Sequence, residues 1–380
     1  ANNFAGRVIE MRFPTLTAFR GVAALVVIVY HARNFFGAPL EEWAKSVDAW
    51  FGQAFIAVDF FFVLSGFVIS HAYLKRFNNA GKNESRAHLT KEFILFRFAR
   101  MWPVHIFFLL IWLADQTAQH YWNPFAVPRE AFKGEAYSIY SFVTNIFMVH
   151  AWGLHNSTSW NFPSWSVSSE WLAYLLFPIT SWLVWKARHH ATRILLSAVI
   201  LGGLYLMKET NPVQTLGWFR FQGSWARVLA SFLYGALLYR TYLAAPWQTK
   251  TRAQSSALLA LLLAAWCATF VYGVDEIILL VCFGPVLLAA AHFDQSHQRI
   301  EKGPLVFLGS ISLSTYLAHA ILLRWWIWAT WGTNGNLSMA QGLSALAAWL
   351  LVVHVIAAAC HKYIEMPAQT RIRAWWKNLA

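Results

Sequence analysis

The chain has 380 residues, of which 58% are hydrophobic and only 12% are charged. Soluble domains carry about 25% charged residues, so this composition excludes a soluble globular protein and a disordered chain. With only three cysteines, a disulfide scaffold is excluded as well. The remaining class is an all-α polytopic membrane protein. Its net charge of +13 is explained by basic cytoplasmic loops, so we expect no nucleic-acid partner.

Ten apolar stretches are long enough to cross a bilayer, which takes roughly 17–25 residues each. With both termini in the cytoplasm, most of the 30 Lys and Arg residues fall on the inner side. The apolar stretch 138–152 is short, so we interpret it as a re-entrant or interfacial part of a large outer loop, 116–165, within a single membrane domain, 1–380. Pro103 and Pro178 should bend or interrupt their helices. The predicted spans are 15–36, 54–74, 93–115, 166–186, 193–208, 223–243, 255–273, 276–292, 306–328 and 340–362.

Ionisable side chains inside these spans are the strongest functional signal, because a charge in the hydrocarbon region costs several kcal/mol. Arg20 and His31 are eleven residues apart, which puts both on one helix face with a rise of about 16 Å. Chain direction places Asp59 and Glu170 at the depth of His31. A carboxylate beside an imidazole raises its basicity, so we expect one of the two to support His31 as a general base.

Arg97 and Arg100 share a face in the first turns of the span 93–115, beside a loop rich in Lys and Arg. Helix-end arginines often only anchor a helix at the membrane surface. The alternative is a clamp for a phosphorylated cytosolic ligand, because the arginine side chain offers a planar fork of donors.

Tryptophans collect near the span ends, as in an aromatic belt at the membrane surface. In the outer loop, Trp160 and Trp165 are also candidates for stacking on a sugar. His189 and His190 are adjacent in a basic inner loop, and for them, as for His354 and His361, we expect a solvated or capping role and no metal site.

Six motifs follow one another between residues 15 and 367. They are LTAFRGVAALVVIVYH with Arg20 and His31, FIAVDFFFVLSGFVIS with Asp59, FRFARMWPVH with Arg97 and Arg100, PSWSVSSEWLAYLLFP with Trp165, Ser166 and Glu170, LGSISLSTYLAHAIL with Tyr316 and His319, and HKYIEMPAQ with Glu365 and Pro367. In this order they resemble the acyltransferase-3 family of integral membrane acyltransferases. His105 stands where that family often has Tyr, and Ala320 follows His319 where it often has Pro, so the resemblance leaves the acceptor unassigned.

The resemblance implies an acyl-CoA-dependent O-acetyltransferase of the bacterial inner membrane, with acetyl-CoA as the cytosolic donor. Arg20, Arg97 and Arg100 are then donor-binding residues, and His31, Asp59 and Glu170 are catalytic. The acceptor is an extracytoplasmic polysaccharide or lipid-linked oligosaccharide. Some family members carry a fused esterase-like domain, which this sequence lacks, so the protein is expected to act alone or with separate glycan-assembly proteins. The acceptor-side residues implied are Trp160, Trp165, Ser166, Tyr316 and His319.

Two questions stay open at this level. Imidazole is also a nucleophile, so a transient acyl-His31 is an alternative to general-base catalysis. Buried histidines and carboxylates also build proton relays, so a proton-coupled transporter or flippase is the rival function. The arginine pair favours the enzyme, because a proton-coupled carrier does not need a phosphate clamp.

Overall fold

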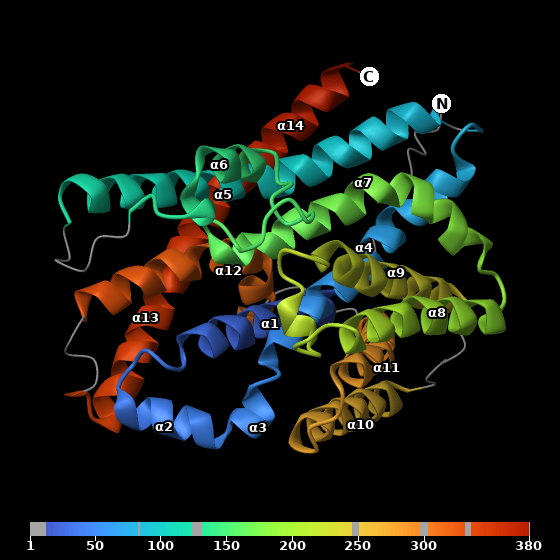
Figure 1. The fold of residues 1–380 in the computed structure, drawn as a ribbon. Helices are drawn as coiled ribbons and strands as arrows, with labels where there is room; N and C mark the ends of the chain where they lie inside the picture. Colours follow the sequence, from blue (N-terminus) through green and yellow to red (C-terminus); the bar gives the residue numbers. More distant parts are fainter. Residues whose placement is uncertain are drawn as a thin grey trace.

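The computed structural model describes residues 13–82, 84–123, 131–244, 251–296, 303–330 and 336–379, which form helices and turns and contain no strand. Ten helices among them have 19 residues or more (Figure 1). They are α1 (Pro14–Ala32), α4 (Ala57–Asn79), α5 (Arg86–Tyr121), α7 (Trp165–Lys186), α8 (His190–Glu209), α9 (Ser224–Leu243), α10 (Arg252–Val271), α11 (Glu276–Ser296), α12 (Pro304–Ala329) and α13 (Met339–Cys360).

The ten long helices stand at the positions of the ten predicted spans, and the all-helical membrane fold is confirmed. Eight helical stretches within the described ranges are long and apolar enough to cross a membrane. The two long helices outside that set are α7 and α9. Both bury polar side chains in the protein interior, including Ser168 and Ser169 on α7 and Arg227 and Ser231 on α9, and this lowers their mean hydropathy.

Shorter elements connect and cover the long helices. They are α2 (Ala38–Ser46), α3 (Asp48–Phe51), α6 (Ile139–Ile146), α14 (Met366–Leu379), the 3₁₀ turns Ala54–Ile56, Glu135–Tyr137, Phe162–Ser164 and Leu216–Trp218, and one π-helical turn, His361–Glu365. The apolar stretch that we expected to be re-entrant contains α6, whose eight residues rise only about 12 Å and cannot span a bilayer.

Helix ends differ most from the prediction around α5. Residues 75–92 were expected to be a loop, but α4 continues to Asn79 and α5 begins at Arg86. With 36 residues, α5 is about 54 Å long and extends beyond both expected ends. Pro103 and Pro178 lie inside α5 and α7, and neither helix is interrupted, so a bend at each proline stays a prediction.

Two pairs of parallel helices pack backbone against backbone through glycines. A Cβ atom on Gly309 of α12 would lie 1.8 Å from the carbonyl oxygen of Thr17 on α1, and one on Gly21 would lie 2.6 Å from the Gly309 nitrogen. Between α4 and α9, Gly66 and Gly235 make equally close approaches, each 1.9 Å from a facing carbonyl oxygen. Small residues of this kind allow membrane helices to approach closely where apolar burial gives little driving force.

We predict that Gly309→Ala lowers the thermal unfolding midpoint in detergent by at least about 3 °C, because the added methyl group must push α1 away from α12. The matched control is Gly202→Ala on α8, where a Cβ atom meets no other atom within 4 Å. That variant should be unchanged or slightly more stable, since Ala favours helix over Gly. Equal midpoints for the two variants would contradict the close packing.

Candidate active site

Three cavities follow the parallel helices α1 and α12 from their first residues to their last. The basic cavity, about 550 Å³, lies beside Pro14, Thr17 and Val306. The waist cavity, about 80 Å³, shares Arg20 and Arg100 with it. The aromatic cavity, about 480 Å³, lies beside the last turns of α1 and α12. Charged residues lining the basic cavity are Arg20, Arg76, Glu92, Arg97, Arg100 and Arg373, and residues lining the aromatic cavity include His31, Trp112, Tyr137, Trp160, Phe162, Arg324 and Trp328.

His31 and His319 form a hydrogen-bonded pair where α1 meets α12. The Nδ1 atom of His31 lies 3.0 Å from Nε2 of His319, and the two rings are parallel within 1°. Phe162 packs edge-on against both rings. His319 is fully buried behind His31, whereas His31 lines the aromatic cavity.

A backbone carbonyl sets the protonation pattern of this pair. The Nδ1 atom of His319 lies 2.6 Å from the carbonyl oxygen of Tyr316, which can only accept, so Nδ1 of His319 carries the proton. In neutral His319 the Nε2 atom is then an acceptor, and His31 must donate to it from Nδ1. This arrangement leaves Nε2 of His31 with a free lone pair, the atom that a general base requires.

Neither carboxylate that we expected to support His31 contacts it in the described part of the chain. Asp59 is fully buried and forms a bidentate ion pair with Arg227 of α9, with Nε–Oδ1 and Nη2–Oδ2 distances of 2.9 and 2.6 Å. Arg227 also donates to the carbonyl oxygen of Leu216 at 2.7 Å. The pair therefore joins α4, α9 and the turn before α9, and the place expected for a carboxylate is taken by His319.

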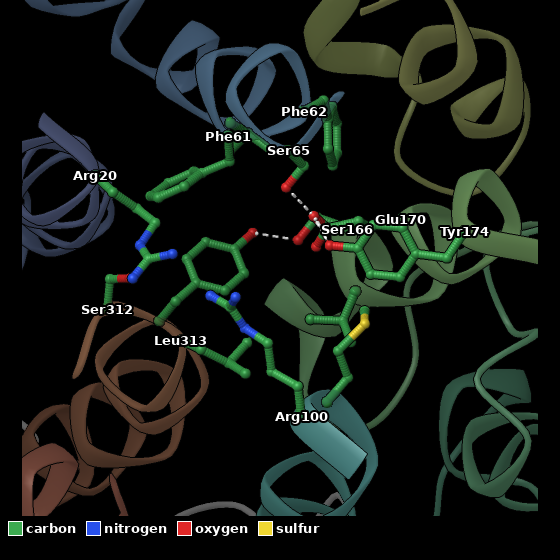
Figure 2. Close-up of a pocket in the computed structure, with 14 residues that line it drawn as sticks. Arg20, Phe61, Phe62, Ser65, Arg100, Ser166, Glu170, Tyr174, Ser312 and Leu313 are labelled. Atoms are coloured by element: carbon green, nitrogen blue, oxygen red, sulfur yellow. Dashed lines mark hydrogen bonds between the residues drawn. The ribbon is translucent and has the colours of Figure 1, made fainter. Parts of the chain in front are cut away.

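Glu170 lies at the waist cavity instead of beside His31. Its Oε1 accepts hydrogen bonds from the hydroxyls of Ser65 and Tyr174, the latter at 2.5 Å. Figure 2 shows Arg20 and Arg100 reaching toward the same space from α1 and α5. The waist therefore combines two guanidinium groups, one carboxylate and five hydroxyl side chains around a narrow opening.

The arginine pair lies deeper in the protein than expected. Because α5 begins at Arg86, Arg97 is about 16 Å along the helix and not in its first turns. Both Arg97 and Arg100 line the basic cavity, and neither forms an ion pair with a described carboxylate. Arg20, at the end of the cavity nearest the waist, donates from Nε and Nη2 to the carbonyl oxygen of Gly309.

The two candidate stacking tryptophans have different surroundings. Trp160 lines the aromatic cavity, and its indole N–H donates to Ser141 at 3.0 Å. Trp165 is buried in the core, with the Arg227 guanidinium 5.2 Å from its ring centroid, and lines none of the three cavities. Ser166 and Tyr316 line the waist and are hydrogen bonded to each other at 3.1 Å.

A polar core holds the loop that carries Trp160. Asn145 donates to Ser159 at 2.8 Å, and Thr144 is hydrogen bonded to His155 at 2.8 Å. His150 is buried against Ser164, and burial lowers the pKa of His150 well below its ordinary value, so the ring is neutral at physiological pH. The loop is therefore a packed wall of the aromatic cavity.

A sequence model described as an acyltransferase domain matches residues 13–360, nearly the whole chain. The chain belongs to the acyltransferase-3 family. Acyltransferase MdmB of Streptomyces mycarofaciens is 27% identical over 387 residues, which cover 94% of this chain and 92% of the relative. No solved structure matches the chain.

Two further relatives match only in part. Peptidoglycan O-acetyltransferase OatA of Listeria monocytogenes is 28% identical over 173 residues, 43% of this chain and 23% of the relative. Protein 2 in the picA locus of Rhizobium radiobacter is 39% identical over 104 residues, 27% of this chain and 45% of the relative. The aligned part thus spans less than half of each of these two proteins.

Several charged side chains of this acyltransferase-3 protein were missed by the sequence analysis. Arg227 and Arg324 both lie inside predicted spans, so the test for ionisable groups in the membrane could have found them. Arg324 pairs with Asp115 at 3.1 Å and stacks on Trp328 at 3.7 Å, at the aromatic cavity. Arg373 lies beyond the last predicted span, and nothing in the sequence indicated that it lines a cavity.

We predict that Asp59→Asn destabilises the protein by about 3–5 kcal/mol, because it leaves the buried Arg227 guanidinium without its counter-charge. The double variant Asp59→Leu/Arg227→Leu should recover much of the loss, since it removes both charges together. Thermal unfolding in detergent measures both effects. Normal stability of Asp59→Asn together with a shifted pH profile of transfer would restore Asp59 as a catalytic group.

Proposed function

We propose that this acyltransferase-3 protein transfers an acetyl group from acetyl-CoA to a hydroxyl group of a polysaccharide or glycolipid, with His31 as the general base. The observation that carries the proposal is the His31–His319 pair, because it leaves Nε2 of His31 free at the edge of the aromatic cavity. The printed name of one relative, a peptidoglycan O-acetyltransferase, supports transfer of an acetyl group to a glycan oxygen.

The donor enters from the basic cavity in this proposal. Arg97 and Arg100 bind phosphate groups of acetyl-CoA, since arginine forks suit phosphate oxygens. The waist cavity, about 80 Å³, accepts only a narrow chain and not a nucleotide. The thin pantetheine arm passes Arg20 and the Ser166–Tyr316 pair and carries the thioester toward His31.

The acceptor occupies the aromatic cavity. Rings of Trp112, Tyr137, Trp160 and Trp328 line it, and such rings stack on the apolar faces of sugars. Nε2 of His31 removes the proton from the acceptor hydroxyl, whose oxygen attacks the thioester carbonyl. The carbon–sulfur bond then breaks, and the proton on His31 passes to the leaving thiolate, which restores the neutral histidine pair.

We place the protein in the bacterial inner membrane with both termini in the cytoplasm. The distribution of Lys and Arg over the loops supports this orientation. It also puts the basic cavity on the side of cytosolic acetyl-CoA and the aromatic cavity on the side of the extracytoplasmic acceptor.

We predict that His31→Gln lowers transfer by about 10²–10⁴-fold, because glutamine keeps much of the volume but cannot take the proton. The measurement is acetyl transfer to isolated surface glycan by purified protein, with acetyl-CoA binding as the control for folding. Normal turnover by a variant that binds acetyl-CoA normally would end the assignment of His31.

His319 should act through His31 and is a positioning residue. We predict that His319→Leu, which removes the acceptor for Nδ1 of His31, lowers the transfer rate by about 10–10²-fold and alters its pH profile. His319→Gln offers an amide oxygen as acceptor and should retain more activity. Equal rates and pH profiles for the two variants would contradict control of the His31 tautomer.

Arg97→Lys tests the donor site, since it keeps the charge but loses the planar fork. We predict weaker acetyl-CoA binding, measured by calorimetry in detergent, with normal expression and thermal stability. Unchanged affinity would mean that Arg97 does not bind the donor phosphates.

A further inference from the structure

The C-terminal helix α14 lies against the first half of α5 (Figure 1). It continues from α13 through the π-helical turn His361–Glu365. The buried Glu365 holds that turn, because its carboxylate accepts from His361 at 2.9 Å and from Gln369 at 3.3 Å. π-Helical turns inside helices occur frequently at functional sites.

Two ring contacts fix how α14 sits on α5. Trp376 packs against His88 with ring centroids 4.8 Å apart, and the Arg373 guanidinium lies 5.4 Å from the centroid of Phe96. Phe96 directly precedes Arg97 in sequence, and Arg373 lines the basic cavity with Arg97. The C-terminal helix thus places the guanidinium group of Arg373 at the basic cavity, where the acyl donor is proposed to bind.

The charges around the basic cavity do not balance. Five arginines line it, but Glu92 is its only carboxylate among the described lining residues, and Glu92 is paired with Arg76 at 2.7 Å. Arg97, Arg100 and Arg373 have no carboxylate partner within the described ranges.

This cluster is electrostatically costly without an anion. Arg100 and Arg373 both lie close enough to repel Arg97, and the Nε atom of Arg97 is buried without a hydrogen-bond partner in the described part of the chain. An unpaired buried donor destabilises the protein, and more so when it is charged. Three separate forks around a cavity of about 550 Å³ match a ligand with more than one phosphate group.

We propose that Arg373 on α14 completes a three-arginine site with Arg97 and Arg100 for the phosphorylated nucleotide end of acyl-CoA. The inference rests on the proposed function, which supplies acyl-CoA as the donor. Arg100 also lines the waist cavity, whereas Arg97 and Arg373 line only the basic cavity. Arg373 therefore lies toward the end farther from His31, where the nucleotide phosphates and not the pantetheine arm reside.

The test compares Arg373→Gln with Arg371→Gln, a matched loss of charge two residues earlier on the same helix. Arg371 does not line the basic cavity, and both side chains are exposed, so neither change should unfold the protein. Calorimetry on the full chain in detergent gives the dissociation constants of CoA and of 3′-dephospho-CoA. We expect Arg373→Gln to raise the dissociation constant of CoA about 10-fold or more. The ratio of the two dissociation constants, which measures the preference for CoA over dephospho-CoA, should become smaller in this variant. Arg371→Gln should change neither the dissociation constant nor the ratio by more than about 2-fold.

Two further arms separate the possible outcomes. The first measures CoA binding by wild type and by Arg97→Lys. If wild type binds no CoA, the proposed function fails together with this inference. If wild type binds CoA and Arg97→Lys weakens binding while Arg373→Gln matches Arg371→Gln, only the role of Arg373 is overturned. The second arm measures the preference of wild type and Arg373→Gln for anionic lipid, in nanodiscs with and without phosphatidylglycerol. Loss of the anionic-lipid preference in Arg373→Gln with unchanged CoA affinity would assign Arg373 to a lipid headgroup and overturn the proposal.

Discussion

The parallel contact between α1 and α12 is the constraint on which the rest of the site depends. Gly21 and Gly309 let the two backbones touch, and this close approach allows Arg20 to reach the carbonyl oxygen of Gly309. Eleven residues further along α1, the same approach brings His31 to His319. Because both helices rise about 1.5 Å per residue in the same direction, this one contact aligns Arg20 and His31 at two depths along the three cavities.

Much of the candidate site could be predicted from the sequence, because ionisable groups are costly in the membrane and so mark the interior. This rule found His31, Glu170 and three of the five arginines of the basic cavity, Arg20, Arg97 and Arg100. It could not predict their partners, since pairing depends on which helices are neighbours. Asp59 was expected at the depth of His31, but α4 packs on α9, so Asp59 pairs with Arg227. The partner of His31 comes from α12, almost 300 residues away in sequence.

The number and order of the helices could also be predicted, because bilayer thickness sets the length of an apolar stretch. The positions of the helix ends could not be predicted. Charged residues such as Lys91 and Glu92 suggested a loop, yet they extend α5 beyond its apolar part, where a helix needs only its own hydrogen bonds to continue. That extension provides the surface on which α14 packs, and therefore the place of Arg373. The amphipathic pattern of α14 does not indicate which helix it will pack against.

The cavities are also compatible with both the proposed transfer across the membrane and a closed permeability barrier. A wide passage between the basic and aromatic cavities would leak ions, whereas the waist has room for only a few water molecules at about 30 Å³ each. Its two guanidinium groups, Arg20 and Arg100, oppose the passage of cations. A thin acyl chain attached to a large anionic head can enter such a waist while its head is retained by the arginines behind it. The proposed donor has a bulky charged end and a slender reactive arm. Its shape therefore matches the order in which a wide basic cavity, a narrow waist and a histidine follow one another.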